Sequence, residues 1–269
     1  MTDVAVPVFA AIVIWWSSTG SLLWLVRQNK SVRLFTALIA SIAVLAATVA
    51  VYSLRDIDTL SGAYIGFTCG IVLWAWHECM FLFGYISGPR KTPCPPNLKI
   101  WPRFIVSTEA VIHHEVAIAA HGGLILLLSL GAENAVAAMT FFLLWGMRLS
   151  SKALVFLGAP NISDHMLPNH LKYLSTYFNK KQATALFPLL IAVVSGITAV
   201  LIYLGLTHLS GTFPAVSYML LATLASLAVI EHLALVLPVP DAILWAWAIH
   251  ENTDTEQVSR RTRPDYGRT

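Results

Sequence analysis

Residues 104–130 read FIVSTEAVIHHEVAIAAHGGLILLLSL, an apolar stretch long enough to cross a lipid bilayer. Five ionisable side chains interrupt this stretch and should lie at membrane depth: Glu109, His113, His114, Glu115 and His121. Ionisable groups are costly inside a membrane and are usually retained at functional sites. We therefore expect this stretch to determine both the fold of the chain and the position of its site.

The whole chain has the composition of a membrane protein. Of its 269 residues, 57% are hydrophobic and 12% are charged, and the mean hydropathy is +0.70. A soluble domain carries about 25% charged residues. Seven stretches reach the roughly 20 residues that a span needs: 5–26, 32–54, 61–86, 104–130, 134–157, 184–207 and 214–237. We predict an all-α bundle of seven transmembrane helices in a single domain over 1–250, followed by a basic, disordered cytoplasmic tail over 251–269.

Basic residues gather in alternate loops of this predicted bundle. Of the 17 Lys and Arg residues, only Arg55 falls in the opposite set of loops, and only Arg148 and Lys152 fall inside a span. The positive-inside rule then places the N-terminus outside and the tail in the cytoplasm. Because the net charge of +3 is sorted by loop, it needs no nucleic-acid partner. A shorter apolar stretch over 242–249 is expected to form an interfacial helix.

Ionisable residues from four of the predicted spans fall at a common depth near the cytoplasmic side. At about 1.5 Å per residue, they lie roughly 9–15 Å from the inner ends of their helices. We predict that they surround one polar pocket: His77, Glu78, Glu109, His113, His114, Glu115, Arg148, Glu231 and His232. Arg148 would be the counter-ion of Glu78 or Glu231. The cytoplasmic loop could cap this pocket with Asp164, His165 and His170.

The chemistry of these residues allows three kinds of site. Carboxylate and imidazole ligands from four helices hold two irons in bundle proteins, and the candidate ligands here are Glu78, Glu109, His113, Glu231 and His232. The usual Glu-x-x-His spacing is replaced by Glu-x-x-x-His, so a hydrogen-bonded structural network or a pocket for pigment or substrate remains open. The candidate cofactors are non-haem iron, bacteriochlorophyll and haem, since His77, His113 or His121 could also ligate a haem iron or a chlorin magnesium.

Other common site chemistries are absent from the sequence. Phosphate-binding glycine loops, nucleophilic triads and desaturase-type histidine boxes do not occur. Cys69, Cys79 and Cys94 form no CxxC pair and are not expected to build a disulfide framework. Hydrolytic and nucleotide-driven functions are therefore disfavoured.

Several motifs together resemble the PuhE family of photosynthetic complex assembly proteins of purple bacteria. They are WHE at 76–78, FGYISGPR at 83–90, RF at 103–104, HHE at 113–115 and NHLKYL at 169–174. The resemblance runs over nearly the whole chain. It implies a multi-pass protein of the bacterial inner, intracytoplasmic membrane that helps to build the reaction-centre and light-harvesting apparatus or adjusts its bacteriochlorophyll supply. The implied partners are subunits of those complexes or pigment-synthesis enzymes.

Two functions of different classes therefore compete. The first is a membrane-embedded assembly factor that binds a pigment or a nascent pigment-protein. The second is a membrane metalloenzyme that uses a Glu/His di-metal centre on a tetrapyrrole or another lipid-soluble substrate. A proton-linked carrier is a weaker third alternative, because transporters often show internal repeats and broken helices that this sequence lacks.

Overall fold

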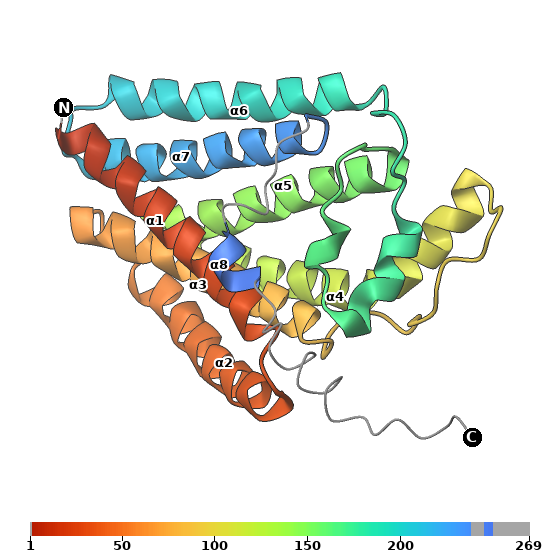
Figure 1. Cartoon of the computed structure of the whole chain (residues 1–269). Helices are drawn as coiled ribbons and strands as arrows, with labels where there is room; N and C mark the ends of the chain where they lie inside the picture. The colour runs from red at the N-terminus through yellow and green to blue at the C-terminus, as the bar shows by residue number, and fades with distance from the viewer. Residues whose placement is uncertain (1, 238–244, 250–269) are drawn as a thin grey trace, which may run out of the picture.

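The computed structural model describes residues 2–237 and 245–249 (Figure 1). Seven of its helices are long and apolar enough to cross a membrane, which confirms the predicted all-α bundle. They are α1 (Thr2–Leu25), α2 (Lys30–Ser53), α3 (Leu60–Leu82), α4 (Ile100–Leu128), α5 (Val136–Leu157), α6 (Phe187–Thr207) and α7 (Phe213–Ala234). The described residues contain no β-strand. The predicted tail over 251–269 lies outside them, and the orientation of the bundle stays a prediction.

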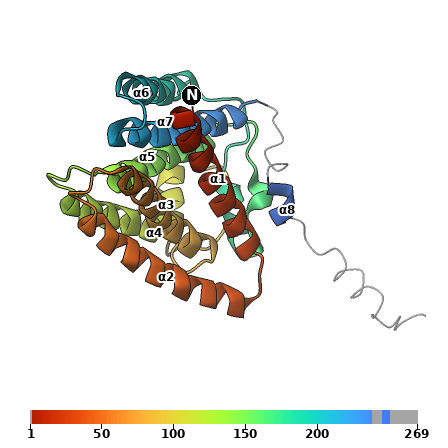
Figure 2. The same cartoon turned by 90° about the vertical axis from the view of Figure 1, so that its left-hand side faces the viewer.

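Helices α3 and α7 form the centre of the bundle. In the most apolar 18-residue segment of each of these two helices, 61% is buried. The same fraction is at most 22% in any other spanning helix. Figures 1 and 2 show α6 and α2 at opposite edges, with α3, α5 and α7 between them. Large apolar side chains such as Phe9, Leu45 and Tyr203 remain exposed on the outer helices. This arrangement fits a protein whose outer surface faces lipid.

A stripe of glycines brings α3 and α5 into close contact. Gly62, Gly66 and Gly70 follow one another at four-residue spacing and lie on one face of α3. A Cβ atom at Gly70 would lie 2.8 Å from the carbonyl oxygen of Ala137. Small residues of this kind let helix backbones approach closely in membranes, where interhelical packing drives association. The stripe fixes α5 beside α3 and so determines which polar side chains can meet.

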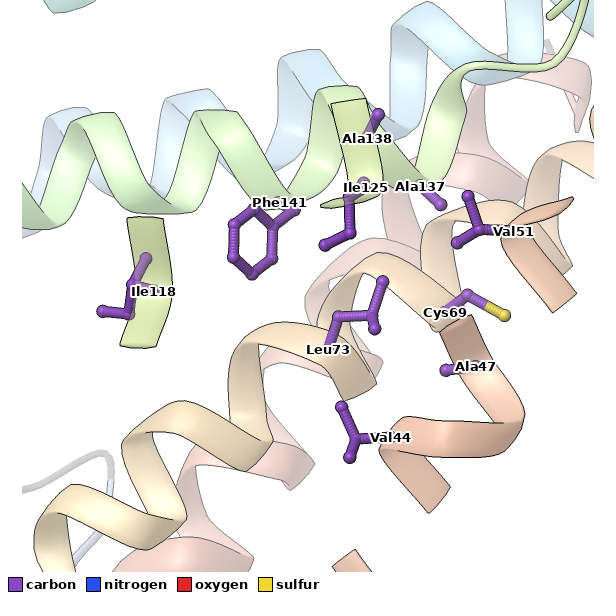
Figure 3. Packing of buried hydrophobic residues seen from close by; sticks show 10 residues of the cluster. All are labelled: Val44, Ala47, Val51, Cys69, Leu73, Ile118, Ile125, Ala137, Ala138 and Phe141. Atoms are coloured by element: carbon purple, nitrogen blue, oxygen red, sulfur yellow. The ribbon is translucent and has the colours of Figure 1, made fainter. Parts of the chain in front are cut away.

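A cluster of buried apolar residues joins α2, α3, α4 and α5 (Figure 3). Phe141 lies at its centre, with Leu73 of α3 and Ile118 and Ile125 of α4 around it. Leu73 is one turn from His77, and the ring of Phe141 lies 5.9 Å from the His77 ring. The apolar cluster therefore adjoins the polar layer and closes it on the side away from the basic loops.

Two helices begin or end four residues away from their predicted bounds. The span predicted over 61–86 ends at Leu82, because Gly84 adopts a φ of +79° and the N–H groups of Tyr85 and Ile86 both donate to the Met80 carbonyl. Helix α4 begins at Ile100 rather than 104. Pro102 is compatible with that start, since a first-turn N–H has no intrahelical partner in any case.

The short helix α8 (Ala246–Ile249) packs against α1. The ring of Trp245 lies 5.4 Å from that of Trp15, and the ring of Trp247 lies 5.7 Å from that of Trp16. Gly20 provides the room, because a Cβ there would meet the Trp247 ring. The segment predicted to lie at the interface thus sits against the side of α1, while residues 242–244 are outside the described part.

Candidate functional site

Glu78 of α3 is the centre of the polar layer. Arg148 of α5 donates from Nη2 to the Glu78 Oε2 atom at 3.2 Å. The other carboxylate oxygen, Oε1, lies 4.0 Å from the Nε2 atom of His114 on α4. Glu78 and His114 are both buried. Three spans therefore bring a carboxylate, a guanidinium and an imidazole together, with Glu78 rather than Glu231 as the partner of Arg148.

A second ion pair lies beside the first. Lys152 of α5 pairs with Glu115 of α4. Lys152 follows Arg148 by four residues, so both cations lie on one face of α5. Glu115 is among the residues predicted to line the pocket, whereas Lys152 is not. Its spacing from Arg148 was the signal that could have found it.

A chain of hydrogen bonds links α3, α4 and α2 deeper in the bundle. The Thr48 hydroxyl donates to the Val44 carbonyl at 2.8 Å, so its oxygen accepts from His121 Nε2 at 3.2 Å. His121 Nδ1 is then the acceptor for His77 Nε2, at 3.0 Å. This assignment makes the His121 imidazole neutral, with all three bonds running in one direction. His77 and His121 are thus joined to each other rather than to Glu78.

His232 joins α7 to α5. Its Nδ1 atom lies 2.7 Å from the Ala228 carbonyl oxygen, and its Nε2 atom lies 2.7 Å from the hydroxyl of Ser150, which also lies 2.8 Å from the Met147 carbonyl oxygen. The ring is buried. His232 therefore sits in a satisfied structural contact, separate from the Glu78 pair.

The structure does not bring the five candidate metal ligands together. Glu109 and His113 are exposed on α4, and Glu231 is exposed on α7. Glu109 lies 3.6 Å from Arg90 of the preceding loop. Within residues 2–237 and 245–249, no group of three His, Cys, Asp or Glu side chains could hold a metal ion.

The rotation of α4 about its axis explains this separation. The face of α4 that packs inward carries His114, Ile118 and Ile125, all fully buried. His113 lies about 100° round the helix from His114 and therefore faces outward. Glu109 is four residues before His113 and shares its outward face.

The loop between α5 and α6 closes the basic end of the bundle. Its 3₁₀ helix η2 (Asn169–Tyr177) buries Leu171, Leu174 and Tyr177 against Phe81 of α3 and Ala110 of α4. His170 Nε2 donates to the Leu82 carbonyl at the end of α3, at 2.9 Å. The loop therefore covers the end of the polar layer through apolar contacts and one imidazole.

The other two loop residues lie apart from this contact. Asp164, in the 3₁₀ helix η1 (Asp164–Met166), pairs with Lys180 of the same loop at 2.6 Å. The side chain of His165 is outside the described part of the structure.

We expect His170 to make the folded protein less stable in acid. Partial burial lowers the pKa of His170, and the nearby charges of Arg33 and Lys91 lower this pKa further. A lowered pKa in the folded state means that the unfolded chain takes up the proton first. The stability that neutral His170 gives to the folded protein is therefore present above about pH 6.5 and is lost as the pH falls below that value. Thermal unfolding at pH 7.5 and 5.0 should show a larger drop for the wild type than for His170→Gln, by up to about 2 °C. Equal drops would contradict this assignment.

Three buried polar atoms of the layer have no hydrogen-bond partner among the described residues. They are Glu78 Oε1, His77 Nδ1 and His114 Nδ1. Buried polar groups are normally paired, and exceptions commonly mark a bound water, an ion or a functional group. The rings of His77 and His114 are packed against Trp76 and Phe81, with centroids 4.9 and 4.6 Å apart. A water molecule could meet these unpaired atoms.

Comparison with known proteins gives two matches. A family model described as "Protein of unknown function (DUF3623)" matches residues 1–256, which include all of the spanning helices. The chain is also 30% identical over 252 residues to an "Uncharacterized 30.4 kDa protein in puhA 5'region" of Rhodobacter capsulatus, covering 92% of this chain and 91% of that protein. No solved structure matches.

Proposed function

This chain belongs to the DUF3623 family, and from that membership we propose that it is a membrane-embedded assembly factor for the photosynthetic reaction-centre and light-harvesting complex. The observation that carries the proposal is the relative that matches it over nine-tenths of both chains and is described by its position beside puhA, a photosynthesis gene. The resemblance of its motifs to the PuhE family agrees with this. The bacterial inner membrane is its proposed location.

The structure supports a role carried out inside the membrane. Seven spanning helices account for most of the described residues, and the longer loops fold back onto the basic end of the bundle. Exposed apolar side chains cover the outer helices, where a transmembrane subunit or a hydrophobic cargo could dock. We propose bacteriochlorophyll or one of its precursors as that cargo.

The cargo would bind at the lipid-facing side of the polar layer. His77 and His114 are each 1% exposed, so a macrocycle bound at the surface would not contact them. The scattered Glu and His side chains lend no support to the di-metal enzyme or to a resident haem. Pigment handling through a surface site is therefore the function that the geometry supports best.

Deletion of the gene in its photosynthetic host tests this function. We expect a severalfold loss of assembled reaction-centre and light-harvesting absorption per cell, with slower phototrophic growth, because assembly would lack its membrane factor. Absorption spectra of membranes and growth in light measure both effects. A plasmid copy of the wild-type gene should restore them, while an empty plasmid should not. Unchanged spectra and growth in the deletion strain would contradict the proposal.

A further inference from the structure

Helices α4 and α5 meet along a seam that combines cations with aromatic rings. Arg148, Lys152 and Phe156 follow one another at four-residue spacing on one face of α5. Lys152 therefore lies about 6 Å, and Arg148 about 12 Å, from Phe156 along the helix. From the other side of the seam, Glu115 pairs with Lys152, and Phe104 contacts Phe156 with ring centroids 5.8 Å apart.

The end of this seam nearest the basic loops is an open apolar groove. The groove has a volume of about 240 Å³ and is lined by Ile100, Trp101, Phe104 and Phe156. The rings of Trp101 and Phe104 are stacked, with an interplanar angle of 21°. The Arg103 guanidinium lies over the Phe156 ring at 4.6 Å. Flat aromatic walls of this kind suit a flat apolar ligand.

The two cations of the seam are accessible from outside. The side chain of Arg148 is 43% exposed and that of Lys152 is 32% exposed, although both lie within a spanning helix. A guanidinium has five N–H donors, and one hydrogen bond joins Arg148 to Glu78. Exposed donors at this depth would face hydrocarbon, which is unfavourable unless an anion or water meets them.

The buried side of the seam is also incompletely paired. Glu78 Oε1 and His114 Nδ1 lie directly behind Arg148 in the polar layer and have no hydrogen-bond partner among the described residues. The His114 side chain is 2% exposed and the Glu78 side chain is 11% exposed. The charged groups of the seam thus have unused hydrogen-bonding capacity on both sides of Arg148.

From these observations we propose that the α4–α5 seam binds an amphipathic carboxylic acid with a flat, apolar ring body. The ring body lies over Phe104 and Phe156, and the carboxylate is bound by Lys152 and the exposed donors of Arg148. This inference rests on the proposed function, which identifies the ring body as that of a pigment. It adds that the pigment carries a free carboxylic acid. The seam would take a free-acid chlorin and reject the esterified pigment, which has no anionic group.

The depth of Arg148 favours such an acid over a membrane phospholipid. Arg148 lies nine residues, about 13 Å, inside the end of α5 at Leu157. A lipid phosphate is held at the level of the headgroups, so it would reach Arg103 or Lys152 before Arg148. A carboxylate on an apolar body is not tied to that level.

Binding of a matched acid and ester tests this proposal on the full chain in phosphatidylcholine nanodiscs. Pheophorbide should bind about tenfold more tightly than its methyl ester, because only the acid makes charge-assisted hydrogen bonds to the seam. In the double variant E78Q/R148Q, which leaves no buried charge unpaired, the ratio should fall to within about twofold. Phe156→Ala should weaken acid and ester alike, whereas Lys172→Gln, on the exposed basic loop, should leave the ratio unchanged.

Several results would overturn the proposal. Equal binding of acid and ester by the wild type would remove its basis, and so would an acid preference that persists in E78Q/R148Q. In phosphatidylglycerol nanodiscs the wild type should still bind the acid more tightly than the variant does. If that difference disappears, the seam is a phospholipid site. A failure in these binding experiments, together with a deletion strain that still loses its complexes, would overturn this inference and leave the assembly function standing.

Discussion

Replacement of Arg148 by Met should destabilise the folded protein by about 3 kcal/mol, because it leaves the Glu78 carboxylate buried without its counter-ion. The Glu78 side chain is 11% exposed, so water cannot replace the lost guanidinium effectively. We place the cost at the lower end of the range for buried pairs, since Arg148 itself is partly exposed. Unfolding by sodium dodecyl sulfate in mixed micelles, followed by far-ultraviolet circular dichroism, measures the change.

Two further variants show whether the loss of stability comes from breaking the Glu78–Arg148 pair or from the removal of any cation. The double variant E78Q/R148Q should recover stability to within about 1 kcal/mol of the wild type, because neither partner is then left charged. Lys180→Met breaks the more exposed pair with Asp164 and should cost less than about 1 kcal/mol. If Arg148→Met is no more destabilising than Lys180→Met, Glu78 does not depend on the pair.

The length and apolar character of each segment were enough to predict the seven spans. A span must satisfy its backbone hydrogen bonds internally, so a long apolar segment has few alternatives to a helix. The ends of the helices were predicted less well. The apolar run through Phe83, Tyr85 and Ile86 continues beyond α3, and only the left-handed conformation of Gly84 ends the helix. Apolar character alone carries no information about that backbone angle.

The depth of the polar layer could be predicted from residue spacing, whereas the direction of each side chain could not. Depth depends only on the rise per residue, and it brought Glu78, His114 and Arg148 to one level. Direction depends on which face of α4 packs inward. His114, Ile118, His121 and Ile125 repeat at the four- and three-residue steps of a buried face, a pattern that would have identified His114 rather than His113 as the inward imidazole.

Replacement of Gly70 by Leu should be about as damaging as loss of the ion pair, although it changes no charge. A Cβ at this position would lie 2.5 Å from the Thr140 Cβ atom and 2.8 Å from the Ala137 carbonyl oxygen. One of these neighbours is backbone and the other is the first atom of a β-branched side chain, so no rotamer change relieves the contact. We expect α5 to be displaced and the protein to lose about 3 kcal/mol of stability.

The position of α5 gives this variant a second, more specific effect. Arg148 lies eight residues, about 12 Å, along α5 from Thr140, so a shift of the helix should separate its guanidinium from Glu78. Unfolding in mixed micelles measures the stability, and a disulfide engineered between α3 and α5 reports whether the helices keep their spacing. Gly146→Ala is the matched control, because nothing lies within 4 Å of the added methyl group. That variant should be as stable as the wild type or slightly more so, given the higher helix propensity of alanine. If Gly70→Leu behaves like Gly146→Ala, the glycine stripe does not set the distance between α3 and α5, and the meeting of Arg148 with Glu78 needs another cause.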